Sequence, residues 1–230
     1  MEPNLKMKKD QGKGLKDVKL FQQKVGSLIY LTITRPEIAY SIGIVSQFMQ
    51  CPTNVHLDAA KRILRYVKGS IGHGLWYKKC DKVLLNGFVD ADWMGDATSG
   101  YCFNMGSAVI SWCSKKQDVI ALSSIEAEYI AATMAAQECT WLRRLIGDIL
   151  EKVDYVVKLK CDNESAIKLA SNPVFHARTK HIEMRYHFIR KKVLSREIEL
   201  ANVRTNAQVA DIFTKALMKV HGISRGVGDC

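Results

Sequence analysis

Apolar residues change their spacing near residue 74, and this change limits the folds that the chain can adopt. Before it, they recur every three or four positions from Val18 onward, which is typical of amphipathic helices. After it, short apolar runs such as 84–89 and 108–113 appear, which are typical of strands, and a long helical pattern begins only at Ser123. We therefore expect a small helical segment followed by an α/β domain.

The helical part divides into recognisable segments. Residues 1–16 are polar and lysine-rich and predict a flexible basic arm. Residues 17–80 predict short helices separated by breaks at Pro36 and Pro52. Because such short helices cannot bury a large core alone, we expect this segment to pack on the α/β domain.

Residues 81–218 predict a mixed five-stranded sheet flanked by helices. The first three strands form an antiparallel meander, with Gly106-Ser107 as the turn between the second and the third. The remaining elements are expected at 123–150 (helix), 155–160 (strand), after Asp162 (helix), 179–195 (basic helix), 198–203 (strand) and 209–219 (helix). Residues 219–230 are expected to form a tail.

Composition excludes several classes of protein. Lys and Arg number 34 against 23 Asp and Glu, so the net charge is +11, which favours polyanionic partners such as nucleic acid. The seven cysteines are scattered without a C-x-x-C pair, which favours reduced thiols over disulfides or structural zinc. No apolar stretch is long enough to predict a membrane span. We expect an intracellular protein with no membrane contact.

Four carboxylates fall where this layout brings chain segments together. Asp90 ends the first strand, Asp162 follows the fourth, Glu128 lies in the long helix, and Asp211 lies in the last one. An unpaired Asp90 on an apolar strand would be costly to bury, and a divalent cation would resolve that conflict. Oxygen ligands without a nearby imidazole suit Mg²⁺ or Mn²⁺, and such a site can hold two ions.

Each acid also has an alternative role. Ser123-Ser-Ile-Glu126 has the form of a capping box, so Glu126 is the structural glutamate and Glu128 the favoured ligand, although the opposite assignment stays open. Asp162 could instead cap the helix that follows it, and Asp92 is expected to be a turn residue.

The second part of the chain also carries a series of short motifs in a fixed order. They are Asp90-Ala-Asp-Trp93, Thr98-Ser-Gly-Tyr101, Ser111-Trp112, Ser114-Lys-Lys-Gln117, Ala121-Leu-Ser-Ser124, Glu126-Ala-Glu-Tyr129, Cys161-Asp-Asn163, Arg178-Thr-Lys-His181, Ala210-Asp-Ile212 and Thr214-Lys215. This series resembles the ribonuclease H domain of copia-type retrotransposon polyproteins. Upstream motifs resemble the end of the reverse transcriptase in the same polyprotein: Gly26-Ser-Leu-Ile-Tyr30, Thr34-Arg-Pro36, His56-Leu-Asp58 and Arg65-Tyr-Val-Lys-Gly69.

The resemblance implies a ribonuclease H-like fold whose acid cluster holds two metal ions and cleaves the RNA strand of an RNA–DNA hybrid. The cluster is carried onto Asp90, Glu128, Asp162 and Asp211. Residues 17–80 would be the helical remnant of the reverse transcriptase, with other reverse transcriptase subdomains as partners. An apolar patch left exposed there would favour self-association. The location would be the cytoplasm, in a virus-like particle, or the nucleus.

One departure from the family pattern supports a different hypothesis: only four residues separate Trp93 from Thr98, where the family has a longer stretch. Residues 203–206 also contain no histidine, so product release is expected to depend on another group. The alternative is a catalytically inactive remnant that binds nucleic acid or a protein partner.

Basic and polar side chains suggest where a hybrid would bind. A phosphate-binding ridge is predicted from the basic helix, with further contacts to the backbone and to ribose hydroxyls from the segment between the third strand and the long helix. The predicted residues are Arg178, Lys180, Arg190 and Lys191 on the ridge, and Lys115, Lys116, Gln117, Ser123 and Ser124 in the segment. A solvated helix face and helix capping by the serines are the alternatives. A zinc site on His176, His181 and His187 is disfavoured by their spacing.

Overall fold

The computed structural model describes residues 7–79, 84–93, 97–150, 153–171 and 180–216, and in the last range the side chains from residue 187 onward. The helices are α1 (Val18–Leu31), the 3-10 helix η1 (Pro36–Ile38), α2 (Ala39–Ser46), α3 (Asn54–Gly69), α4 (Ser124–Ile149), α5 (Glu164–Ser171), α6 (Lys180–Leu194) and the 3-10 helices η2 (Thr205–Ala207) and η3 (Val209–Phe213). The strands are β1 (Leu85–Asp92), β2 (Thr98–Met105), β3 (Ala108–Lys116), β4 (Val157–Cys161) and β5 (Ile198–Asn202).

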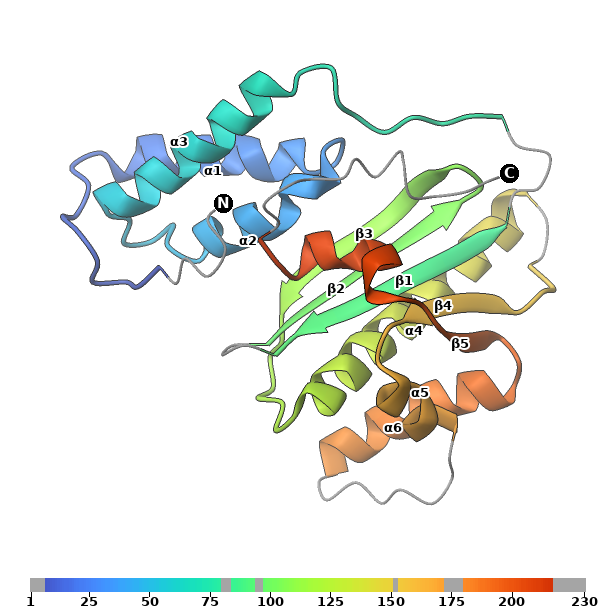
Figure 1. Ribbon diagram of the computed structural model, residues 1–230. Helices are drawn as coiled ribbons and strands as arrows, with labels where there is room; N and C mark the ends of the chain where they lie inside the picture. The colour runs from blue at the N-terminus through green and yellow to red at the C-terminus, as the bar shows by residue number, and fades with distance from the viewer. Residues whose placement is uncertain (1–6, 80–83, 94–96, 151–152, 172–179, 217–230) are drawn as a thin grey trace.

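The strands form one five-stranded sheet in the order β3-β2-β1-β4-β5 (Figure 1). β1, β2 and β3 are antiparallel neighbours, whereas β4 runs parallel to β1 and β5 runs parallel to β4. Gly106 has a φ of +63° in the turn between β2 and β3, a conformation that glycine adopts without steric cost. The mixed sheet and the Gly106-Ser107 turn are as predicted from the sequence.

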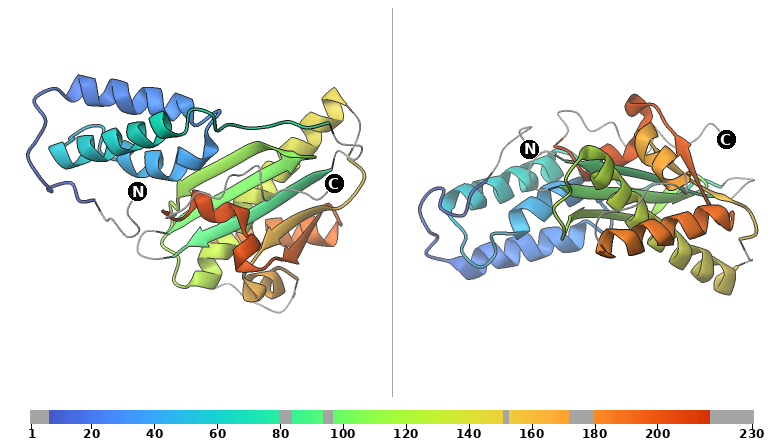
Figure 2. Two further views of the ribbon diagram at one scale, coloured as in Figure 1. Left: turned by 45° about the horizontal axis from the view of Figure 1, so that its top comes forward. Right: turned by 90° about the horizontal axis from the view of Figure 1, so that it is seen from below.

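The two faces of the sheet are covered by different elements. Leu85 and Val89 of β1 belong to the main core with α4, which runs along one face, while Phe88 packs with Phe213 of η3 on the other (Figures 1 and 2). Side chains alternate between faces along a strand, so Asp90 shares the face of Phe88 and lies under η3. The alternation of β1 thus directs one carboxylate toward the C-terminal segment.

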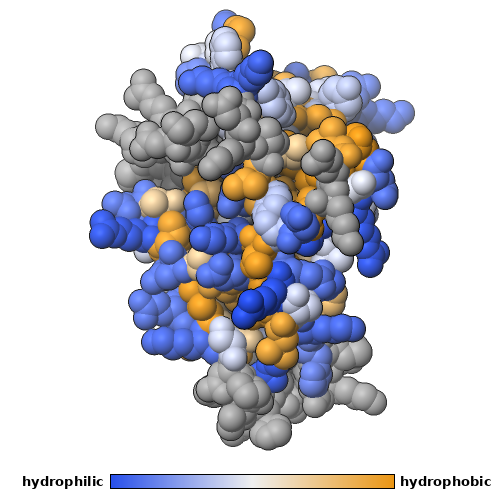
Figure 3. Space-filling model, turned by 90° about the vertical axis from the view of Figure 1, so that its right-hand side faces the viewer, coloured by the Kyte–Doolittle hydropathy of each residue, from blue (hydrophilic) through white to orange (hydrophobic). Residues whose placement is uncertain are grey.

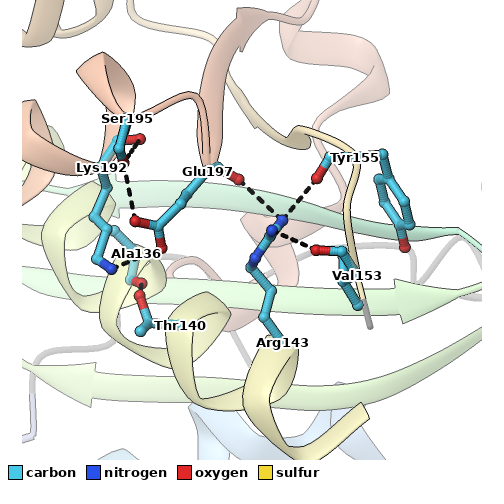
Figure 4. Close-up of polar contacts among 8 residues, drawn as sticks. All are labelled: Ala136, Thr140, Arg143, Val153, Tyr155, Lys192, Ser195 and Glu197. Carbon is cyan, nitrogen blue, oxygen red and sulfur yellow. Dashed lines mark hydrogen bonds and ion pairs between the residues drawn. The ribbon is translucent and has the colours of Figure 1, made fainter. Parts of the chain in front are cut away.

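Arg143 joins the long helix α4 to the connections that precede β4 and β5 (Figure 4). Its guanidinium donates to the carbonyl oxygens of Tyr155 at 2.7 Å, Val153 at 2.5 Å and Glu197 at 3.3 Å. Lys192 of α6 in turn lies 2.7 Å from the Glu197 carboxylate. These contacts fix α4, α6 and the starts of β4 and β5 relative to one another.

The N-terminal helices have a small core of their own, which includes Phe21 of α1 and Ile42 of α2. This core does not stand alone, because α2 lies beside β3 and Ala39 packs against the cluster that contains Phe213. The expected docking of this segment on the sheet domain is therefore present.

Residues 8–15 are fastened to the beginning of α3, although the sequence predicted a flexible arm. The amide of Leu15 donates to the carbonyl of Pro52 at 3.0 Å, and the amide of Lys13 donates to the Asn54 side chain at 2.7 Å. The His56 ring also contacts the carbonyl oxygen of Lys8 at 3.2 Å. Backbone groups of residues 8–15 supply this anchor, and an interpretation based on the polarity of their side chains misses it.

Two further expectations were wrong. Residues 209–213 form the 3-10 helix η3 where an α-helix over 209–219 was predicted, and residues beyond 216 lie outside the described part. The Gln208 amide donates to the Val89 carbonyl at 2.8 Å and thus holds the start of η3 on the sheet. Asp92, expected in a turn, is the last residue of β1 and pairs with Thr98.

Many apolar side chains are exposed in the N-terminal part, including Tyr30, Ile71 and Trp76. Apolar side chains of the sheet domain, such as Ile120, Leu122 and Leu194, are exposed as well. On the side of the molecule in Figure 3, apolar groups alternate with hydrophilic ones. None of the described helices combines the length and the apolar composition that a membrane span requires.

Candidate active site

Asp90 is the buried centre of the acid cluster, with 1% of its surface exposed. The Thr214 hydroxyl donates to its Oδ2, and the Lys215 Nζ lies 3.4 Å from the same oxygen. Burial raises the pKa of Asp90, and this effect outweighs the lowering by the Lys215 ammonium and the Thr214 hydroxyl. The protein thus holds a carboxylate where its charged form is poorly solvated.

Asp211 approaches Asp90 because η3 lies close against β2. Lys215 Nζ lies 3.0 Å from Asp211 Oδ1, so one ammonium contacts both carboxylates. Gly100 pairs with Asp90 across the strands, and a Cβ at Gly100 would lie 2.7 Å from Thr214 Cγ2 and 3.2 Å from the Ala210 carbonyl oxygen. Only glycine leaves room for η3 at this point.

Glu128 and Asp162 form the other half of the cluster. Ligand atoms of Glu128, Cys161 and Asp162 all lie within 4.8 Å of one another. Burial, reinforced by the negative charge of Asp90, raises the pKa of Glu128 to about 8. Burial also raises the pKa of Cys161 to about 12, so this thiol stays protonated and donates to Glu128 Oε2 at 3.8 Å.

Glu126 and Asn163 cap the starts of α4 and α5, the structural roles that were the alternatives to metal binding for the acids near them. The Ser123 hydroxyl accepts from the Glu126 amide at 3.2 Å, and the Glu126 carboxylate accepts from the Leu122 amide at 2.7 Å. Asn163 caps α5, because its Oδ1 accepts from the Ser165 amide at 3.0 Å. Glu126 therefore serves the helix start, and Asp162 is not required as the cap of α5.

The charges and donor atoms of this cluster fit a divalent cation. Four carboxylates, Asp90, Glu128, Asp162 and Asp211, are brought together by β1, α4, η3 and the end of β4, and Lys215 is the cation paired with them in the described part of the chain. Burial disfavours the charged forms of Asp90 and Glu128, so a cation at their oxygens would stabilise both carboxylates. Hard carboxylate oxygens suit Mg²⁺ or Mn²⁺.

The residues predicted to bind nucleic acid from the end of β3 divide into two groups. Lys115 and Lys116 are exposed at that end, and the Lys115 ammonium lies 2.9 Å from Asp118. Gln117 is buried instead, and its amide donates to Ser99 Oγ and to the Ala127 carbonyl oxygen, both at 2.9 Å. Gln117 therefore has a structural role, because its amide holds the first turn of α4 against β2, and its contact with phosphate stays a prediction.

The other predicted contacts are less fully described. Lys191 is exposed on α6 and Arg190 is partly buried there. Lys180 begins α6 but its side chain lies outside the described part, as do Arg178 and the candidate zinc ligand His176. Ser123 is the N-cap of α4 and Ser124 is exposed beside it.

Sequence comparisons connect this geometry with known proteins. No protein-family model matches the chain. The chain is 42% identical over 224 residues to the retrovirus-related Pol polyprotein from transposon RE1 of Arabidopsis thaliana, a match that covers 95% of the chain and 15% of the relative. It is 43% identical over 204 residues to the Pol polyprotein from transposon TNT 1-94 of Nicotiana tabacum, covering 86% of the chain and 15% of the relative.

The chain belongs to the copia-type Pol polyprotein family. It spans about 15% of the length of these relatives, so it corresponds to one segment of such a polyprotein. The resemblance seen in the motifs is thereby confirmed.

This Pol segment also shares its fold with a solved structure. A foamy viral protease–reverse transcriptase in complex with an RNA/DNA hybrid superposes with a TM-score of 0.52 at 13% identity, covering 86% of the segment and 26% of that chain. The fold is ribonuclease H-like, as predicted.

Four residues of the Pol segment's site were not assigned a role from the sequence. Gly100, Thr214 and Lys215 lie in the quoted motifs, but only the crossing of η3 over β2 reveals that they surround Asp90. Cys161 was predicted only to be a reduced thiol, although its place directly before Asp162 at a strand end indicates proximity to the cluster.

Proposed function

We propose that this Pol segment is a metal-dependent endonuclease that hydrolyses the RNA strand of RNA–DNA hybrids. One observation carries the proposal: Asp90, Glu128, Asp162 and Asp211, which are distant in sequence, meet at one edge of the sheet. Their burial raises the pKa of both Asp90 and Glu128, and such shifts are typical of functional carboxylates.

The four acids would hold different positions of a two-ion site. Asp90 is central and would contact each ion, Glu128 and Asp162 would complete one position, and Asp211 would complete the other. Mg²⁺ or Mn²⁺ bound there would supply an activated water and stabilise the leaving oxygen of the phosphodiester. The register of β1 and β2 continues to Asp92 and Thr98, so the short connection after Trp93 leaves the backbone of Asp90 in place.

A cleavage assay tests this proposal. A labelled RNA–DNA hybrid is incubated with the 230-residue chain and Mg²⁺, with EDTA and with a double-stranded DNA of the same sequence. Metal-dependent cleavage confined to the RNA strand supports the proposal. Binding of the hybrid without cleavage under any divalent cation would instead support the inactive remnant.

The nucleic-acid contacts are proposed to include Lys116 at the end of β3 and Lys191 on α6, both of which are exposed cations. Each phosphate contact contributes about −0.7 to −0.9 to the slope of log K against log salt concentration. Replacing Lys116 and Lys191 together with alanine is therefore expected to reduce the magnitude of that slope by about 1.4 to 1.8. Fluorescence anisotropy of a labelled hybrid at several salt concentrations measures the slope.

Lys61 provides the matched control. It is an exposed lysine that pairs with Asp58 at 3.2 Å on α3, in the N-terminal segment. Lys61→Ala removes one positive charge from the same protein and is expected to leave the slope unchanged. The double variant removes two charges and Lys61→Ala removes one, so an effect of Lys61→Ala half as large as that of the double variant would show that net charge, and not this surface, sets the salt dependence.

Other subdomains of the polyprotein are proposed partners of the N-terminal helices. Tyr30 and Ile33 at the end of α1 are exposed apolar side chains, and a neighbouring subdomain would remove them from water. In the isolated chain, self-association through the same side chains is the alternative.

A further inference from the structure

Lys215 is placed where a metal ion would compete with it. Its Nζ lies 3.4 Å from Asp90 Oδ2 and 3.0 Å from Asp211 Oδ1, so the ammonium lies between two of the four acids. We propose that Lys215 is an internal counter-cation that holds the Asp90–Asp211 side of the cluster in the metal-free protein and leaves it when a divalent cation binds. This inference rests on the proposed cation site, but it does not require hydrolysis.

The contacts of Asp90 explain why the two cations exclude each other. Its Oδ2 already accepts the Thr214 hydroxyl and contacts the Lys215 ammonium. A divalent cation at this oxygen would meet a positive charge only a few ångströms away. At such separations the repulsion between cations is strong in a partly buried site, so one of them must leave.

Lys215 is able to leave, whereas Thr214 is not. The Lys215 side chain is 38% exposed and follows the end of η3, so its ammonium can reach water by rotating its own stem. Thr214 is fully buried and its hydroxyl also lies 3.3 Å from the Asp211 carbonyl oxygen. Thr214 therefore orients Asp90 in both states, and Lys215 is the exchangeable group.

The position of Lys215 also explains how the acids coexist without metal. Asp90 and Glu128 as whole residues, and the side chain of Asp211, have at least four-fifths of their surface buried. Negative charges gathered in such a buried cluster repel one another. Burial lowers the pKa of Lys215, but Asp90 and Asp211 outweigh that effect and hold its pKa above the ordinary value, so the ammonium keeps its charge. One tethered cation offsets part of the repulsion.

Thermal denaturation of Lys215→Met tests the exchange. In EDTA the variant is expected to melt at least about 4 °C below the wild type, because the buried acids lose their counter-cation. In saturating Mg²⁺ the difference is expected to vanish, because the wild type has released Lys215 as well. Titration with Mg²⁺ or with Ca²⁺ is expected to show binding roughly tenfold tighter in the variant, because the competitor is gone.

Lys168 offers a matched control for the loss of an ion pair. Lys168 and Glu164 form an exposed pair four residues apart, with Nζ and Oε2 separated by 3.4 Å, and Lys215 and Asp211 are also four residues apart. Lys168→Met is expected to change neither the melting temperature in EDTA nor the affinity for Mg²⁺. Lys215→Arg keeps the charge and is expected to retain most of the wild-type stability in EDTA.

Amine labelling reads the movement of Lys215 directly. The wild-type chain is treated briefly with acetic anhydride in EDTA or in Ca²⁺, and acetylation of Lys215 is measured by mass spectrometry, with Lys168 as the internal standard. Acetylation of Lys215 is expected to rise several-fold with Ca²⁺, because the freed ammonium is no longer held by two carboxylates.

The possible results separate this inference from the proposed function. If Lys215→Met is equally destabilised with and without Mg²⁺, or if Ca²⁺ leaves acetylation of Lys215 unchanged, Lys215 is a permanent structural ion pair and the inference is wrong, while the cation site stands. If neither cation shifts the melting temperature of any variant, the proposed site itself is wrong and the inference fails with it.

Discussion

Replacing Asp90 with asparagine is expected to lower hybrid cleavage by at least about 1000-fold while leaving the fold intact. Asp90 lies between the two halves of the cluster, so its loss affects every proposed ligand position. Burial raises the pKa of Asp90 because it makes the charged carboxylate costly, so the neutral amide is expected to raise the melting temperature of the metal-free protein slightly. Initial cleavage rates and thermal denaturation in EDTA measure both effects.

Asp92→Asn is the matched control for this change. Asp92 is two residues further along β1 and ends the strand opposite Thr98. The same chemical change there is expected to preserve cleavage within a few-fold. A fully active Asp90→Asn variant, or an equally inactive Asp92→Asn variant, would contradict the placement of the cluster around Asp90.

Periodicity predicted the sheet well because its strands carry short apolar runs or alternate apolar with polar residues, and because clear turns bound several of them. The run 84–89 and the glycine at 106 define β1 and the β2–β3 turn from local chemistry alone. The start of α4 was equally readable, since a serine and a glutamate three residues apart satisfy the exposed amides of a first helical turn. Local patterns of this kind do not depend on distant contacts.

Contacts between distant segments were not predictable in this way. Residues 209–213 have helical composition, but the pairing of Gln208 with Val89 and of Thr214 with Asp90 presses them onto the sheet as a short 3-10 helix. Lys215 reaches Asp90 only because of that contact. Gln117 is polar and follows two exposed lysines, so a loop contact was the natural interpretation, and only the packing of α4 on β2 buries it.

The acid cluster could be predicted only in part from local sequence patterns. Strand ends indicated Asp90 and Asp162, because carboxyl ends of parallel neighbours meet at one edge of a sheet, and β1 and β4 are such neighbours. Glu128 was the favoured ligand because Glu126 was assigned to the capping box at the start of the helix. The thiol of Cys161 beside Glu128 was missed, because an isolated cysteine has no spacing pattern to identify it.

Glu126 and Glu128 are expected to differ in both activity and stability when each is changed to glutamine. Glu126→Gln is expected to keep cleavage within a few-fold, because a glutamine carbonyl can accept from the Leu122 amide as the carboxylate does. Glu128→Gln is expected to reduce cleavage at least about 100-fold, because a neutral amide binds a divalent cation far more weakly than a carboxylate. Glu126→Gln thus serves as the control on the same helix.

The pH dependence of stability gives an independent measure of Glu128. Its pKa is about 8 in the folded chain and 4.5 when unperturbed, so between these values the unfolded state loses a proton that the folded state keeps. The metal-free protein therefore loses roughly 2 to 4 kcal/mol of stability as the pH rises from about 5 to 8, and Glu128→Gln removes this loss.

At pH 8 in EDTA, Glu128→Gln is accordingly expected to melt at least about 4 °C above the wild type, and at pH 5 the two should melt together. Saturating Mg²⁺ is expected to reverse the order at pH 8, because the cation stabilises the ionised carboxylate that only the wild type possesses. If Glu126→Gln instead melted above the wild type in EDTA and below it in Mg²⁺, and also lost cleavage, Glu126 would be the ligand. The side of α4 that faces the cation would then be offset by two residues.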